Sequence, residues 1–214
     1  MGDPASAKID YDNPPFPLTP IDRELLAMKD EDFHKITWHD LQTIISNNSL
    51  EELKRIPSDL RRYLAWSHDI KQRYGGITNF VVKERLQWTP LSASGPPRFA
   101  HKSSTPFEEP EDYRVLKNDW PYGLAPGLVH LLVWTKTPIE VDNQQGDVTL
   151  YSRKLIEHFI DEYFVKPLGA DGNQRVLWFK NWVSLQSVRG VDHVHVLVKD
   201  APEELLVRWT TKID

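Results

Sequence analysis

Two histidines, His193 and His195, lie in an apolar run that spans residues 191–198. Successive side chains of a β-strand point to opposite faces, so this spacing predicts that both imidazoles share one face. A pair of imidazoles can bind a metal, hold a phosphate group, or transfer protons and phosphoryl groups. A third histidine, His130, lies in another strand-like run, residues 128–134, and joins the pair if the two strands are neighbours.

The three histidines also permit a structural interpretation. A single histidine on an apolar strand is more often a hydrogen-bonded core residue than a ligand, whereas convergence of three favours a functional site. A metal site of the cupin type needs a Glu and a distant His besides the pair, and no strand supplies an evident Glu. We therefore assign His193, His195 and His130 as candidate catalytic residues and expect no metal and no cofactor.

A short loop before the His130 strand is rich in side chains that bind ligands, namely Asn118, Asp119, Trp120 and Tyr122. Asp119 can accept hydrogen bonds from two hydroxyls of a sugar, and the two aromatic rings offer faces for stacking. A tight turn closed by an aromatic plug would have the same composition. The position beside His130 favours the wall of a pocket.

A second polar loop leads into the histidine pair. Its amide and hydroxyl side chains are Asn181, Ser184, Gln186 and Ser187. Such groups can hold phosphate oxygens, although the ordinary polarity of a loop would also explain them. We count Asn181 and Ser187 among the candidate substrate-binding residues.

The chain divides by composition into four segments. Residues 1–20 contain five of the sixteen prolines and no apolar period, which predicts an extended or disordered arm. Residues 21–88 have helical signals, and residues 89–112 form a proline-rich loop. Residues 113–214 alternate strand and helix signals, and the whole is expected to form one compact domain.

Local signals place individual elements within these segments. Thr37 and a capping box at residues 49–52 mark helix starts, Pro57 opens a longer helix that ends at Gly75, and Thr149 opens another. Strands are expected at 113–117, 128–136, 175–180 and 191–199, and a short helix after Glu203. The pattern predicts an α+β fold: an antiparallel sheet with helices packed on one side, and a helical N-terminal extension.

Composition narrows the class of protein. The 214 residues include no cysteine, which excludes disulfides and thiolate sites and fits a reducing, cytoplasmic location. No apolar stretch approaches the roughly 20 residues of a membrane helix, so we expect no membrane association. The formal net charge is −5, yet residues 51–85 carry eight Lys or Arg against five acids. This basic region is either a solvated helical surface or a patch that binds a polyanion.

The C-terminal half resembles the histidine-triad superfamily of nucleotide hydrolases and transferases. The matching motifs are Asp119-Trp-Pro121, His130-Leu-Leu-Val-Trp-Thr-Lys136, Gln186-Ser-Val188 and His193-Val-His195. The resemblance implies a histidine-triad-like fold, with His193 as the nucleophile and His195 and His130 near the phosphate and leaving group. It also implies that Asp119 holds ribose and that Asn181 and Ser187 lie near phosphate oxygens. The first histidine of the triad is replaced here by Val191.

Most of the chain is similar to the fungal N-acetylglucosamine-induced protein family. The motifs that match it are Tyr74-Gly, Glu84-Arg-Leu-Gln-Trp88, Asn118-Asp-Trp-Pro-Tyr-Gly123, His130 to Lys136, Leu177-Trp-Phe-Lys-Asn-Trp182 and Ser187-Val-Arg189. Some members are arginine-containing cyclodipeptide synthases, which join arginine to a second amino acid from aminoacyl-tRNAs. Through these motifs Lys136 and Arg189 join the expected substrate-binding residues. The chain lacks the Asp-Asp-x-x-Glu motif associated with those enzymes.

These resemblances lead to three functional hypotheses. The first is a tRNA-dependent transferase that forms cyclo-Arg-Xaa, with Arg-tRNA and a second aminoacyl-tRNA bound through the basic region 51–85. An acidic side chain would then bind the substrate guanidinium, and the candidates are Asp112, Asp119, Asp161 and Glu162. The second is a histidine-triad-like nucleotide phosphoesterase or nucleotidyl transferase. The third is a non-catalytic protein that binds a nucleotide or sugar nucleotide.

Overall fold

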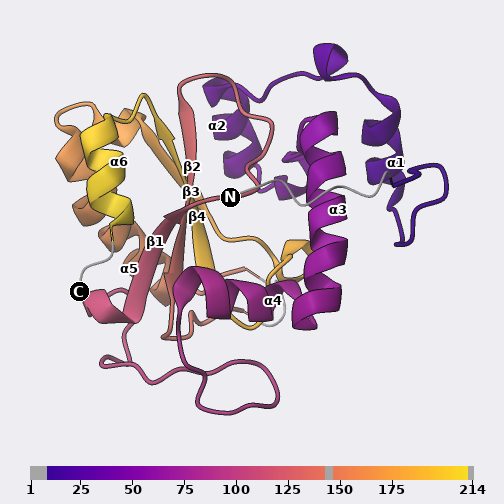
Figure 1. The fold of residues 1–214 in the computed structure, drawn as a ribbon. Helices are drawn as coiled ribbons and strands as arrows, with labels where there is room; N and C mark the ends of the chain where they lie inside the picture. Colours follow the sequence, from indigo (N-terminus) through magenta and orange to yellow (C-terminus); the bar gives the residue numbers. More distant parts are fainter. Residues whose placement is uncertain (1–8, 143–146, 212–214) are drawn as a thin grey trace.

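Four strands form one antiparallel sheet in the order β1-β2-β4-β3 (Figure 1). A computed structural model describes residues 9–142 and 147–211. The strands are β1 Tyr113–Lys117, β2 Leu128–Thr135, β3 Val176–Phe179 and β4 His193–Lys199. The predicted α+β class with an antiparallel sheet is therefore confirmed, and β2 and β4 are adjacent at the centre of the sheet.

The helices begin and end mainly where the local signals predict. They are α1 Pro20–Ala27, α2 Trp38–Ser46, α3 Pro57–Tyr74, α4 Ile77–Phe80, α5 Leu150–Ile160 and α6 Glu203–Thr210. Thr37 caps α2 and Thr149 caps α5, each accepting a backbone amide hydrogen bond. Gly75 ends α3 with a φ of 73°, a left-handed conformation that glycine adopts at little cost. Wider π-helical turns, Val81–Leu86 and Asp161–Val165, extend α4 and α5.

The capping box expected at residues 49–52 is wrong. Ser49 makes no capping hydrogen bond there, and only a single 3₁₀ turn, Leu50–Glu52, follows it. The backbone of Ser49, with φ −90° and ψ 50°, is not in the extended conformation that a helix N-cap requires. The turn instead buries Leu50 and Leu53 in an apolar cluster that also contains Leu41, Phe179 and Leu197.

The two faces of the sheet are covered by different parts of the chain. One face packs against α5 and α6 through a core that includes Leu131, Val133, Val196, Phe164 and Trp209. The opposite face packs against α2, α3 and α4, through clusters that contain Leu132, Trp134, Phe179 and Leu197. Helices were expected on one side only, with the N-terminal part as an extension. In the structure the N-terminal part is the second helical layer (Figure 1).

Two irregular segments are held by specific contacts. In the described part of the N-terminal arm, the Tyr11 hydroxyl donates to the carbonyl of Arg61 at 2.6 Å, and Phe16 packs on His68. The first eight residues of the predicted arm lie outside the described residues. In the proline-rich loop, the buried carboxylate of Asp112 accepts from the backbone amides of Lys102 and Ser103.

None of the helices within residues 9–142 and 147–211 combines the length and apolar character needed to cross a bilayer.

Candidate functional site

The three candidate histidines lie on the same face of the sheet, the one that the N-terminal helices cover. In the antiparallel register, Trp134 is opposite His193 and Leu132 is opposite His195. The ring of His130 reaches diagonally across, so that its Nε2 lies 2.9 Å from Nδ1 of His195. The rings of His193 and His195 are 5.3 Å apart, measured between centroids. The strand spacing thus brings three imidazoles together.

Each imidazole is buried and packed against an aromatic ring. Tyr122 stacks on His130 at 5.1 Å, Phe179 stacks on His195 at 4.6 Å, and Trp134 packs on His193 at 4.3 Å between centroids. Burial disfavours the charged form, which lowers the pKa of His130 to about 3 and that of His193 to about 4. The same cause lowers the pKa of His195 well below its ordinary value. All three rings are therefore neutral at pH 7.

Hydrogen bonds fix the tautomer of His130. The backbone amide of Trp120 donates to Oδ1 of Asn118, so the Asn118 side chain presents its NH₂ group, 3.3 Å from Nδ1 of His130. Because Nδ1 accepts this bond, the proton of neutral His130 lies on Nε2 and is donated to Nδ1 of His195. His195 then carries its own proton on Nε2.

The next partner in the chain of hydrogen bonds is Asn181. Its amide lies 3.2 Å from Nε2 of His195 and 3.3 Å from the hydroxyl of Tyr122. The Nε2–H of His195 needs a hydrogen-bond acceptor. The side-chain oxygen and NH₂ group of Asn181 are nearly isosteric, and only the orientation with the oxygen toward His195 provides that acceptor. The other amide atom of Asn181 is buried and has no hydrogen-bond partner among the described residues.

His193 differs from the other two histidines. Its Nδ1 lies 2.9 Å from the carbonyl oxygen of Val191, which can only accept, so the ring proton is on Nδ1. Nε2 therefore keeps its lone pair, and no hydrogen bond to it is found within residues 9–142 and 147–211. His193 lines a cavity, and this nitrogen is the one that suits attack on a substrate or removal of a proton.

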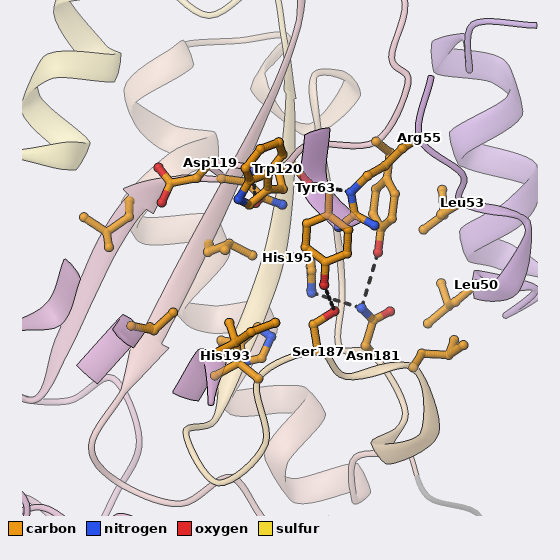
Figure 2. Close-up of a pocket in the computed structure, with 18 of the residues that line it drawn as sticks. Leu50, Leu53, Arg55, Tyr63, Asp119, Trp120, Asn181, Ser187, His193 and His195 are labelled. Atoms are coloured by element: carbon orange, nitrogen blue, oxygen red, sulfur yellow. Dashed lines mark hydrogen bonds between the residues drawn. The ribbon is translucent and has the colours of Figure 1, made fainter. Parts of the chain in front are cut away.

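A cavity of about 360 Å³ lies between the histidine face of the sheet and the N-terminal helices (Figure 2). Its walls are mainly apolar, and the aromatic residues that line it are Tyr63, Trp66, Phe80, Trp120, Tyr122 and Trp134. Its polar side chains include Arg55, Arg85, Asn118, Asp119, Asn181, Ser187, His193 and His195. An apolar cavity with a few convergent polar groups is the usual form of a small-molecule site.

Asp119 lines this cavity, but its carboxylate already has a partner. Arg85 donates from Nε and a terminal nitrogen to the two carboxylate oxygens, both at 2.8 Å. Each oxygen keeps a second lone pair for a ligand hydroxyl. Trp120 belongs to an aromatic cluster, with its ring 5.3 Å from Trp66 and 5.6 Å from Tyr63.

Two of the predicted substrate-binding residues do not reach the cavity. Lys136 lies in a separate cleft with Arg98 and Asp192, and its Nζ is 5.6 Å from the ring centroid of Trp88. Arg189 is exposed and does not line the cavity. Ser187 does line it, and its hydroxyl accepts from Tyr63 at 3.0 Å.

Of the four acids considered for a substrate guanidinium, only Asp119 lines the cavity. Asp112 is held by backbone amides in the proline-rich loop. Asp161 and Glu162 pair with Lys166 at the end of α5, which packs on the opposite face of the sheet.

The basic region 51–85 is less available to a polyanion than its composition indicates. Four of its cations pair with carboxylates: Arg62 with Asp59, Arg73 with Asp69, Lys83 with Glu84, and Arg85 with Asp119. Two arginines of this region, Arg55 and Arg85, line the cavity instead of a flat outer surface. Reasoning from sequence missed them as site residues because both were counted as surface charge.

Lys180 is a further residue that the sequence did not single out. It is 8 % exposed, and its Nζ lies 3.0 Å from Asp192, directly before His193 in the chain. A buried ammonium is costly without such a partner, so the ion pair supports the start of β4. Among the described residues, no group of three or more His, Asp or Glu side chains is arranged to hold a metal ion.

The chain matches known proteins over most of its length. The family model described as "Protein of unknown function (DUF3605)" matches residues 37–199. N-acetylglucosamine-induced protein 1 of Candida albicans is 30 % identical over 181 residues, which cover 79 % of this chain and 70 % of that protein. An uncharacterized protein of Saccharomyces cerevisiae, YPL067C, is 31 % identical over 163 residues, covering 75 % and 77 % respectively.

A solved structure shares the fold. The structure described as "Crystal Structure of HTC1" superposes with a TM-score of 0.53 at 27 % sequence identity, covering 78 % of this chain and 86 % of the other. The match supports the arrangement of sheet and helices described above.

Proposed function

We propose that this chain, which belongs to the family described as "Protein of unknown function (DUF3605)", is a cytoplasmic histidine-dependent transferase that forms arginine-containing cyclodipeptides from aminoacyl-tRNAs. The observation that carries the proposal is the state of His193. It is a neutral imidazole with its proton held on Nδ1 by a carbonyl, its Nε2 has no hydrogen-bond partner among the described residues, and the residue lines a largely apolar cavity.

The proposed reaction needs a base more than any other group. The α-amine of one aminoacyl ester attacks the ester carbonyl of the other, and Nε2 of His193 takes the proton that the amine loses. The 3′ oxygen of the terminal adenosine leaves and receives that proton. A second round within the same dipeptidyl ester closes the ring, so two ester bonds break, two amide bonds form, and two tRNAs depart. With a pKa of about 4, His193 is in the neutral form required at pH 7.

The other groups of the cavity suit the terminal adenosine and the reacting carbonyl. The rings of Tyr63, Trp66 and Trp120 offer apolar faces for adenine, and stacking of a base on an aromatic side chain stabilises binding by about 1–3 kcal/mol. Asp119 has lone pairs for ribose hydroxyls or a substrate guanidinium. The hydroxyl of Ser187 lines the same cavity and can donate to the oxygen that becomes negative during attack.

A second candidate function is a nucleotide phosphoesterase or nucleotidyl transferase. The tautomer of His193 favours it, because an imidazole that is held at Nδ1 and free at Nε2 can attack phosphorus as well as remove a proton. The ion pairing of half the cations in region 51–85 also favours a ligand smaller than tRNA. A non-catalytic nucleotide-binding protein would have the same cavity without turnover.

The first test is product formation. The purified full chain is incubated with Arg-tRNA and a mixture of other aminoacyl-tRNAs, and products are analysed by mass spectrometry. We expect a cyclic dipeptide that contains arginine with the wild type and with His158→Ala, and none with His193→Ala. His158 is an exposed histidine on α5, so it controls for loss of an imidazole elsewhere.

The same samples separate the alternatives. Hydrolysis of an adenosine phosphoramidate that His193→Ala abolishes, together with no cyclic dipeptide, would support the second candidate. Stabilisation by AMP in a thermal shift assay without any turnover would support the binding protein. Failure to form any arginine-containing product would overturn the first proposal.

A further inference from the structure

Arg55 is held in a fixed orientation at the wall of the cavity (Figure 2). Its Nε donates to the backbone carbonyl of Trp120 at 3.3 Å. Its guanidinium carbon lies 4.1 Å from the ring centroid of Tyr63 and 5.7 Å from that of Tyr122, which are cation–π distances. These contacts hold the plane of the guanidinium. Within residues 9–142 and 147–211 the only hydrogen bond of this side chain is from Nε, so the two terminal NH₂ groups remain available as a fork.

The charge of Arg55 has no carboxylate partner in the described parts of the chain. Arg85, in the same cavity, donates from two of its three guanidinium nitrogens to Asp119, which also neutralises its charge. Arg55 forms no such ion pair, although it is half-buried beside neutral imidazoles. It lies near enough to His130 and His195 for its positive charge to lower the pKa of both rings. A partly desolvated cation without a counterion favours binding of an anion.

Further polar groups line the same cavity as this guanidinium. The hydroxyls of Tyr63 and Ser187, which are 3.0 Å apart, line the same cavity. Asn181 is 7 % exposed, lines the cavity, and retains one buried amide atom without a partner among the described residues. In the orientation required by His195, that atom is the NH₂ donor. A guanidinium fork with several separate donors fits the three oxygens of a phosphate group better than the two coplanar oxygens of a carboxylate.

We propose that Arg55 binds a phosphate group on the 5′ oxygen of the substrate adenosine, with Ser187 and Asn181 as further donors in the same cavity. The phosphate itself follows from the cavity, whereas the attached adenosine rests on the proposed function. Two sources share this chemistry: the monoester of a free nucleotide, and the diester that precedes the last adenosine of a tRNA. Bidentate binding of phosphate is the geometry for which arginine is better suited than lysine.

The test is equilibrium binding by titration calorimetry with three probes: adenosine, AMP, and the dinucleotide cytidylyl-(3′→5′)-adenosine. We expect at least one of the phosphate-bearing probes to bind wild type about ten- to hundredfold more tightly than adenosine, the range of a charged hydrogen-bonded pair. Arg55→Met should remove this preference and leave adenosine binding unchanged. Arg55→Lys should keep only part of it. Arg73→Met, which removes an exposed arginine outside the cavity lining, should bind like wild type.

Each outcome has one meaning. Tighter binding of AMP identifies a free nucleotide as the source, and equal or tighter binding of the dinucleotide identifies the end of tRNA. The Arg55 site is overturned if adenosine binds as tightly as both phosphate probes, if Arg55→Met weakens all probes equally, if Arg73→Met has the same effect, or if no probe binds at millimolar concentration. Absence of cyclic dipeptide with the phosphate preference intact would remove the proposed reaction alone.

Discussion

Acidification from pH 7 to pH 5.5 should destabilise the protein through its three buried histidines. Above the ordinary histidine pKa of about 6.5, these rings are neutral in both the folded and the unfolded chain. Their protonation therefore does not reduce the free energy of unfolding in that range. As the pH falls below this value the unfolded chain binds protons, whereas the folded chain binds them only near the lowered pKa values of about 4 for His193 and about 3 for His130. Stability is therefore lost between pH 6.5 and pH 4.

The size of the effect follows from proton linkage. Between pH 7 and pH 5.5, each histidine that stays neutral in the folded state lowers the free energy of unfolding by a little over about 1 kcal/mol. The three rings together lower it by about 4 kcal/mol. This is a large fraction of the roughly 5–15 kcal/mol that stabilises a typical domain.

Urea denaturation at both pH values, followed by tryptophan fluorescence, measures this loss. The variant His130→Gln should lose about 1 kcal/mol less than wild type between the two pH values, because one proton-binding group has been removed. The variant His158→Gln should lose as much as wild type. A total loss below about 1 kcal/mol, or the same loss in His130→Gln and wild type, would refute the assignment of neutral buried imidazoles.

Two further substitutions test the support of the site. In Gly123→Ala the new methyl group would collide with the ring of Phe33, so we expect the free energy of unfolding in urea to fall by about 1–3 kcal/mol. In the control Gly76→Ala the methyl group meets nothing within 4 Å, and the free energy of unfolding should change little. Equal effects of the two substitutions would contradict the packing described. Lys180→Met leaves Asp192 without its ion-pair partner and should lower the free energy of unfolding by about 2 kcal/mol. The loss is smaller than for a fully buried pair because Asp192 is partly exposed. Unchanged stability would show that the pair does not support β4.

The arrangement of the histidines was predictable because it depends on a local rule. Side chains two residues apart on a strand point to the same face of the sheet, as those of His193 and His195 do. The strand that carries His130 is adjacent to theirs. The starts of α2, α3 and α5 followed from Thr37, Pro57 and Thr149 for the same reason. Ser49 shows the limit of such rules, since the same type of signal gave only a 3₁₀ turn.

The cavity itself was not predictable from local patterns. It exists because α3 and α4 pack over the histidine face, and this places Arg55 and Tyr63 beside residues more than 100 positions later in the chain. In the sequence Arg55 is one cation among eight in the basic region. Only tertiary packing distinguishes it from Arg62 or Arg73, which pair with acids one helical turn away.

The central claim, that His193 presents an unprotonated Nε2 to the cavity, is tested most directly by nitrogen-15 NMR of the histidine side chains at pH 7. The His193 signals are assigned by their loss in His193→Gln. We predict a neutral ring with its proton on Nδ1, and a change in the Nε2 shift when AMP is added. A doubly protonated ring at pH 7, or a proton on Nε2, would contradict the account.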